Sequence, residues 1–71
     1  MKVYEGGINP DNLWEKGATY RTAYSTVYEN NIYSTYPIHW GNIQFRIVNA
    51  GGLAVRYKYG DGNWSSWKTL I

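Results

Sequence analysis

The chain has 71 residues, 18% of them aromatic, and seven lysines and arginines against five acidic residues. With no cysteine and one histidine, it excludes disulfides, thiolate metal sites and multi-histidine metal sites, and no cofactor is expected. The length suits one domain, residues 1–71, and the scattered +2 net charge does not indicate a nucleic-acid partner. No apolar run is long enough to span a bilayer, so membrane insertion is not expected.

The first predicted element is a short helical turn within residues 9–17. Asn9 is a candidate N-cap, Pro10 suits the first helical position, and a glycine follows the end of the segment. Leu13 and Trp14 are its only large apolar residues. We therefore expect this turn to dock on a sheet as a small lid.

The next stretch predicts strands. Residues from Ala18 to Tyr24 alternate in the manner of a strand. The strand-like pairs Val27-Tyr28 and Ile32-Tyr33 follow, separated by the turn-prone pair Asn30-Asn31. Pro37 holds the preceding residue extended and lacks a backbone donor, which suits a loop or a strand edge.

The clearest pattern is a hairpin of two alternating strands, Ile43–Val48 and Leu53–Tyr59. The connection Asn49–Gly52 has hairpin length and contains two glycines, which accept positive φ. We expect the hydrophobic side chains of both strands to be buried. The opposite face is then solvated and carries the basic side chains, namely Arg46, Arg56 and Lys58.

A second turn, Gly60–Asn63, leads into a last predicted strand, Trp64–Leu70. The Asp61-Gly62 pair favours a type I′ turn, and Asp61 is interpreted as turn chemistry because no second acidic residue lies nearby for calcium. Residues three apart point to opposite faces of a regular strand, so Trp67 is expected inside and Trp64 partly exposed. A bulge at the two intervening serines would instead place both rings on one face.

These patterns predict a small all-β domain. We expect an antiparallel meander sheet or sandwich of about four or five strands, with one short N-terminal helical turn. A chain of this length supplies little core by itself, so packing between copies is expected to contribute to its stability.

The C-terminal residues carry a resemblance to a known family. Two tryptophans three apart follow a glycine turn and precede a basic residue and a leucine, in Gly62-Asn63-Trp64-Ser65-Ser66-Trp67-Lys68-Thr69-Leu70. Weaker matches are Asn12-Leu13 before Gly17-Ala18-Thr19-Tyr20, Pro37 before Gly41-Asn42, and Val55-Arg56-Tyr57. Residues 12–71 thus resemble the C-terminal knob-like domain of phage tail fibres and pyocin fibres. The chain departs from that pattern where Asn49–Gly52 directly joins two strands that a glutamine-bearing strand often separates.

The resemblance implies a homotrimeric fibre end, at the distal tip of a virion tail fibre, that contacts a bacterial surface glycan without catalysis. The chain is then the whole of such a domain or the C-terminal piece of a longer fibre protein. A trimerisation or folding cap of a fibre, without a ligand of its own, is the second hypothesis. A small nucleic-acid-binding β-domain is the third.

Candidate ligand-binding residues are mostly aromatic. Tyr33, Tyr36, His39 and Trp40 lie within eight residues around a proline, in an expected loop, and loops on a rigid scaffold often carry recognition. Such rings offer flat apolar faces to sugar C–H groups and polar groups at their rims, or they plug the sheet end or a trimer interface. Two further candidates are Trp64 and Arg56, the latter through charge-assisted hydrogen bonds to anionic groups.

Catalysis is not expected. His39 is the only conventional base, and no motif places a serine or carboxylate beside it. Glycoside hydrolysis needs two carboxyl groups flanking the bond, and the acidic residues show no such pairing along the chain.

Overall fold

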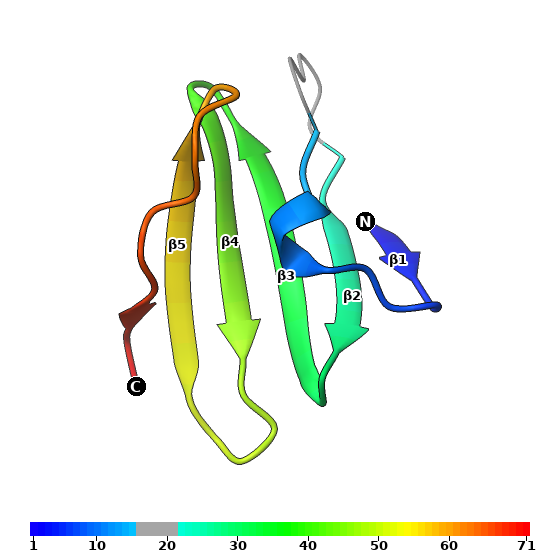
Figure 1. Cartoon of the computed structure of the whole chain (residues 1–71). Helices are drawn as coiled ribbons and strands as arrows, with labels where there is room; N and C mark the ends of the chain where they lie inside the picture. The colour runs from blue at the N-terminus through cyan, green and yellow to red at the C-terminus, as the bar shows by residue number, and fades with distance from the viewer. Residues whose placement is uncertain (16–21) are drawn as a thin grey trace.

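The computed structural model describes residues 1–15 and 22–71. Within these residues, six strands form one sheet in chain order, and one 3₁₀ turn, η1 (Pro10–Asn12), lies over it (Figure 1). The strands are β1 (Lys2–Tyr4), β2 (Tyr24–Tyr28), β3 (Asn31–Ile38), β4 (Gly41–Ile47), β5 (Leu53–Tyr59) and β6 (Lys68–Thr69). The predicted small all-β domain with an N-terminal helical turn is confirmed. The sheet is mixed, because β1 runs parallel to β2 while the other neighbours are antiparallel.

The turn η1 forms where the sequence predicts it but is shorter than predicted. Asn9 caps it, accepting a hydrogen bond from the Asp11 backbone N–H at 2.9 Å, and Pro10 occupies the first turn. Leu13 closes η1 and is buried against the sheet, as a lid requires. The glycine expected after this segment, and most of the predicted strand 18–24, lie outside the described residues.

The hairpin between β4 and β5 is confirmed. Phe45 pairs with Val55, and Ile47 pairs with Leu53 next to the connection. The connecting turn is closed by a hydrogen bond from the Val48 N–H to the Gly52 carbonyl, at 3.0 Å. The β5 strand has the predicted bounds, whereas β4 begins two residues earlier than predicted.

The expectation of a loop over residues 33–40 is wrong. This segment belongs to β3 as far as Ile38, and Pro37 is buried and pairs with Asn42 of β4. The pairing of β2 with β3 begins at Thr35, so Pro37 has no β2 residue opposite it. The missing backbone N–H of proline is therefore tolerated at this position. The sequence predicted that Pro37 lies either in a loop or at a strand edge, and the structure shows it at a strand edge.

One face of the sheet is covered by other segments and the other face is open. The hydrophobic face was expected to be the covered one, but the structure covers the basic face. The covered face lies under η1 and the C-terminal segment, and it carries the basic side chains of the hairpin. Arg56 and Lys58 are 7% and 6% exposed, whereas Tyr59 on the hydrophobic side of the same strand is 63% exposed. The expected solvated basic face is therefore wrong, because distant aromatic residues pack onto it. Alternation along a strand defines two faces but does not say which is covered.

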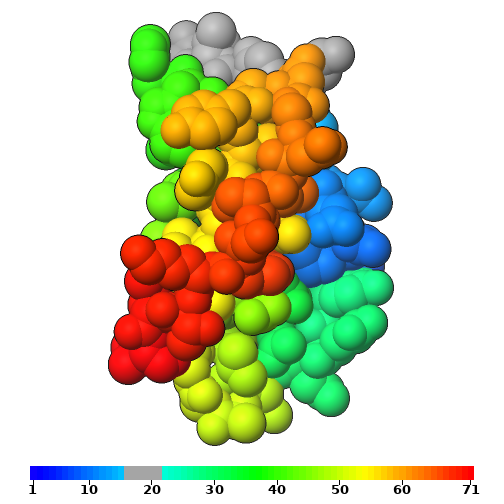
Figure 2. All heavy atoms as spheres, turned by 60° about the vertical axis from the view of Figure 1, so that its left-hand side comes forward, coloured from blue at the N-terminus to red at the C-terminus, as the bar shows by residue number. Residues whose placement is uncertain are grey.

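The C-terminal segment is not one strand. Only β6 and an isolated bridge between Trp64 and Lys58 pair with β5. Between these two pairings, the Ser65 N–H donates to the Tyr57 carbonyl at 2.8 Å, and the Ser65 hydroxyl oxygen accepts a hydrogen bond from the Tyr57 N–H at 3.0 Å. This irregular stretch places Trp64 and Trp67 on the same face, as the bulge alternative required. Figure 2 shows these orange and red residues lying across the yellow strand β5, beside the blue N-terminal segment.

Two turns use positive φ at positions other than those predicted. The β2–β3 turn has φ of 49° at Glu29 and 66° at Asn30, which is the pattern of a type I′ turn, one residue before the predicted Asn30-Asn31. In the turn after β5, positive φ lies at Gly60, so the expected type I′ turn at Asp61-Gly62 is wrong.

We predict that Glu29→Asn stabilises the domain by about 0.5–1 kcal/mol, because asparagine tolerates the left-handed conformation better than glutamate. Urea unfolding followed by tryptophan fluorescence measures the change. Glu5→Asn is the control, since Glu5 also lies in a turn but does not itself have a positive φ. An equal gain in both variants would contradict the explanation.

Candidate functional site

Cations and tryptophan rings alternate on the covered face. Lys58 Nζ lies 4.3 Å from the Trp14 ring centroid and 5.3 Å from that of Trp64. Arg56 Cζ lies 4.5 Å from the Trp64 centroid and 4.4 Å from that of Trp67. Arg46 Cζ closes the series, 4.4 Å from the Trp67 centroid. We name this set the cation–tryptophan stack; its members are Trp14, Lys58, Trp64, Arg56, Trp67 and Arg46.

The spacing of the stack follows from strand geometry. Side chains two residues apart on one face of a strand are separated by about 6.8 Å, which leaves room for one flat ring between them. Trp64 occupies that space between Arg56 and Lys58. Each desolvated cation–ring contact contributes up to about 2 kcal/mol, and the methylene stems cover further apolar surface.

The guanidinium of Arg56 is the most connected group of the stack. Its Nε donates to Gln44 Oε1 at 2.7 Å, and its Nη2 donates to Asp11 Oδ1 at 3.0 Å. Burial lowers the pKa of Arg56 from its ordinary value, and the hydrogen bond to Asp11 opposes that shift. Gln44 Nε2 in turn donates to the Pro10 carbonyl and to Thr35 Oγ1, each at 2.9 Å. This network joins η1 to β3, β4 and β5.

A hydrogen bond between Tyr24 and Glu15 holds the segment after η1 beside strand β2. The Tyr24 hydroxyl donates to Glu15 Oε2 at 2.5 Å. This hydrogen bond, with desolvation and the nearby negative charge, raises the pKa of Tyr24 to about 12. The contact keeps Glu15 beside the sheet, next to Trp14 of the stack.

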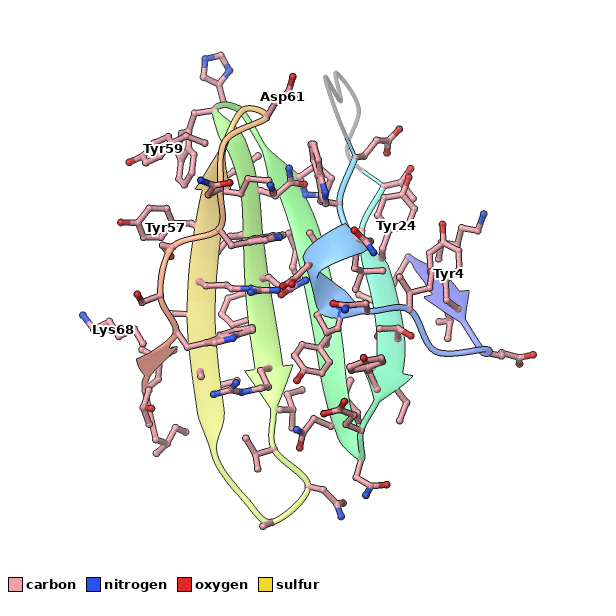
Figure 3. The ribbon with its side chains drawn as sticks, viewed as in Figure 1. Tyr4, Tyr24, Tyr57, Tyr59, Asp61 and Lys68 are labelled. Carbon is pink, nitrogen blue, oxygen red and sulfur yellow. The ribbon has the colours of Figure 1, made fainter. Side chains whose placement is uncertain are left out.

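Three exposed aromatic side chains form a cluster at one end of the open face. Trp40, in the turn between β3 and β4, lies 4.5 Å from Tyr59 and 5.9 Å from Tyr57, measured between ring centroids. Tyr57 and Tyr59 pack edge to face at 5.5 Å. In Figure 3 both tyrosines project from β5 on the side away from η1. We call Trp40, Tyr57 and Tyr59 the aromatic cluster.

A small cleft of about 120 Å³ adjoins the aromatic cluster. It is lined by Glu15, Ile38, His39, Trp40, Gly41, Asn42 and Gly60. Asn42 is buried, and its Oδ1 has no hydrogen-bond partner. Pockets that enclose small molecules measure about 300–1,000 Å³, so this cleft admits one substituent of a ligand lying over the surface.

The six predicted ligand residues do not form one surface. Tyr33, Arg56 and Trp64 lie on the covered face, where Tyr33 packs against the Trp67 ring at 6.0 Å. The other three are Tyr36, His39 and Trp40. Tyr36 packs against Phe45 on the open face, His39 is exposed in the β3–β4 turn, and Trp40 belongs to the aromatic cluster. These three lie toward one end of the sheet.

Tyr57 and Tyr59 were not among the residues predicted from the sequence to bind a ligand. Alternation assigned them to the hydrophobic side of the hairpin, which was expected to be buried. Their hydroxyl groups and their position beside the turn that follows β5 are the signals that distinguish them from core residues.

Comparisons with family models, with curated proteins and with solved structures find no match for this chain. Among the described residues, no group of three histidine, cysteine or acidic side chains is placed to hold a metal ion. A search of the same residues finds no helix long and apolar enough to cross a membrane.

We predict that Arg56→Lys lowers the free energy of unfolding by about 1–2 kcal/mol, because lysine keeps the charge but loses the planar fork. Asp11→Asn should cost less, about 0.5 kcal/mol, since exposed ion pairs contribute little. Lys68→Arg, at an exposed position, is the control. Equal losses for Arg56→Lys and Asp11→Asn in urea unfolding would show that the ion pair, not the stack, dominates.

The raised pKa of Tyr24 predicts that the free energy of unfolding decreases at alkaline pH. Its pKa of about 12 in the folded chain exceeds the ordinary 10.0, so the folded state retains a proton that the unfolded chain has lost. The stabilisation is complete below pH 10 and is lost as the pH rises toward 12. NMR titration of the tyrosine Cζ signals should show Glu15→Gln lowering this pKa. Glu5→Gln should leave it unchanged, and an unchanged pKa in Glu15→Gln would contradict the assignment.

Proposed function

We propose that this domain is the non-catalytic receptor-binding end of a phage-like tail fibre, and that it recognises carbohydrate on the host cell surface. The resemblance of residues 12–71 supports the tail-fibre part. The observation that carries the carbohydrate part is the aromatic cluster of Trp40, Tyr57 and Tyr59, exposed together at one end of the open face.

The chemistry of the cluster suits a sugar. Flat apolar ring faces pack against sugar C–H groups, while phenol hydroxyls and the indole N–H hydrogen-bond at the rim. The β3–β4 turn adds His39, which is exposed next to Trp40. The ligand therefore lies across the exposed rings of the cluster, as an extended surface glycan allows.

The cleft also supports binding without hydrolysis. Of the described residues that line it, Glu15 alone has a carboxylate, and that carboxylate accepts a hydrogen bond from Tyr24. Glycoside hydrolysis uses two carboxyl groups, one on each side of the scissile bond.

A second function, holding the chains of a fibre together, is favoured by a different observation. The open face beyond the aromatic cluster is hydrophobic and stays uncovered in the single chain, including Val27 and Ile47. An uncovered sheet face of this kind is typical of an interface between proteins.

We predict that Trp40→Ala and Tyr59→Ala each weaken binding to a glycan array or to whole bacteria by about tenfold, which corresponds to about 1.4 kcal/mol for one lost stacking contact. Tyr4→Ala, at the far edge of the sheet, is the control and should bind normally. Circular dichroism checks that each variant folds. Undiminished binding by Trp40→Ala, or no carbohydrate binding by the unmodified chain, would overturn the proposal.

A further inference from the structure

The open face below the aromatic cluster is a continuous hydrophobic surface. We call it the hydrophobic patch; it comprises Val27, Ile32, Tyr36, Ile43, Phe45, Ile47, Leu53 and Val55. Val27 is 61% exposed and Ile47 is 46% exposed, although both lie within strands of the sheet. The turn η1 and the tryptophans of the C-terminal segment pack on the other face, so these segments leave the patch uncovered.

The strand register makes the patch flat and contiguous. One row across β3, β4 and β5 is Ile32, Ile47 and Leu53, and the next is Ser34, Phe45 and Val55. The four strands β2 to β5 contribute no charged side chain to this face, because their basic residues all point to the covered side. Lys68 of β6 pairs with Val55 and therefore places one charge at the edge of the face. A partner surface needs no compensating charge at its centre and must be apolar there.

The area of the open face approaches what an interface requires. Seven of its large hydrophobic side chains are 39–63% exposed and together offer about 700 Å² per copy, close to the roughly 800 Å² that one partner contributes to a specific interface. These seven are Val27, Ile32, Tyr36, Ile47, Trp40, Tyr57 and Tyr59. Soluble monomers rarely leave patches larger than a few hundred Å² exposed.

The interior of the single chain is correspondingly poor in hydrophobic side chains. Among the described residues, the buried hydrophobic ones are Leu13, Tyr33 and Ala54. Most residues of the covered core are polar or charged, among them Gln44, Arg56 and Lys58. The largest apolar surface of the domain thus remains unburied until another molecule covers it.

We propose that the hydrophobic patch packs against the same patch of a second copy of this chain. Because the only charge that β2 to β6 place on this face, Lys68, lies at its edge, the apolar centre can meet itself across a two-fold axis without repulsion, and each contact is then made twice. Two sheets packed in this way form a sandwich with a core about 10 Å thick, and their strands cross at about 30°. The observations behind this inference are independent of carbohydrate recognition.

Analytical ultracentrifugation of the whole chain, from low to high micromolar concentration, tests the proposal. We expect the unmodified chain to associate, and Ile47→Lys and Val27→Lys each to raise the dissociation constant at least about tenfold. Thr69→Lys is the control, because Thr69 is exposed but pairs with Ala54 and so lies on the covered side of the sheet. The tryptophans of the stack lie on the covered face, so their fluorescence reports whether each variant is folded.

The association state of the chain and of its variants supports or overturns the proposed pairing. An assembly of two chains that the patch variants dissociate supports the proposal, whereas an assembly of three chains around one axis overturns the two-fold pairing. A monomer at high concentration, or an assembly that Ile47→Lys and Val27→Lys leave intact, overturns it. Trp40→Ala separates the two proposals, because it should lose carbohydrate while the copies stay associated. Loss of association in Trp40→Ala would assign the aromatic cluster to the interface.

Discussion

The guanidinium of Arg56, held between the rings of Trp64 and Trp67, is the interaction on which the rest of the structure depends. It is buried, and an unpaired buried cation would cost several kcal/mol. Here Gln44 and Asp11 each accept a hydrogen bond from it, and the rings of two tryptophans lie within 4.5 Å of its Cζ atom. The position of η1 and the path of the C-terminal segment both follow from these contacts.

This arrangement reverses the usual distribution of residues across a sheet. Basic side chains are buried when their charge is paired and their stems are covered, and the tryptophans provide that cover. Because both covering segments lie on the basic side, they leave the opposite side open. The hydrophobic residues of β4 and β5 are then available for contacts with other molecules, and the functional proposals draw on that surface.

The open face divides into two regions of different chemistry. The aromatic cluster combines ring faces with hydroxyl and indole groups, which suits a ligand that is partly polar. The hydrophobic patch, with Ile32, Phe45 and Ile47 at its centre, offers few hydrogen-bonding groups and suits an equally apolar surface. Of the residues predicted to bind ligand, Trp40 lies in the first region and Tyr36 in the second, while Tyr33 lies on the covered face.

The sequence by itself determined the β4–β5 hairpin and the short N-terminal turn, because alternation, glycine turns and the Asn9-Pro10 pair act over a few neighbouring residues. It also indicated two alternatives for the tryptophans at the chain end. It did not indicate β1 or the length of β3, because both depend on pairing with other strands. Only the tertiary structure decided which side of the sheet is covered and that both rings lie there. That choice depends on contacts between residues far apart in the chain, such as Asp11 with Arg56, and no local pattern contains them.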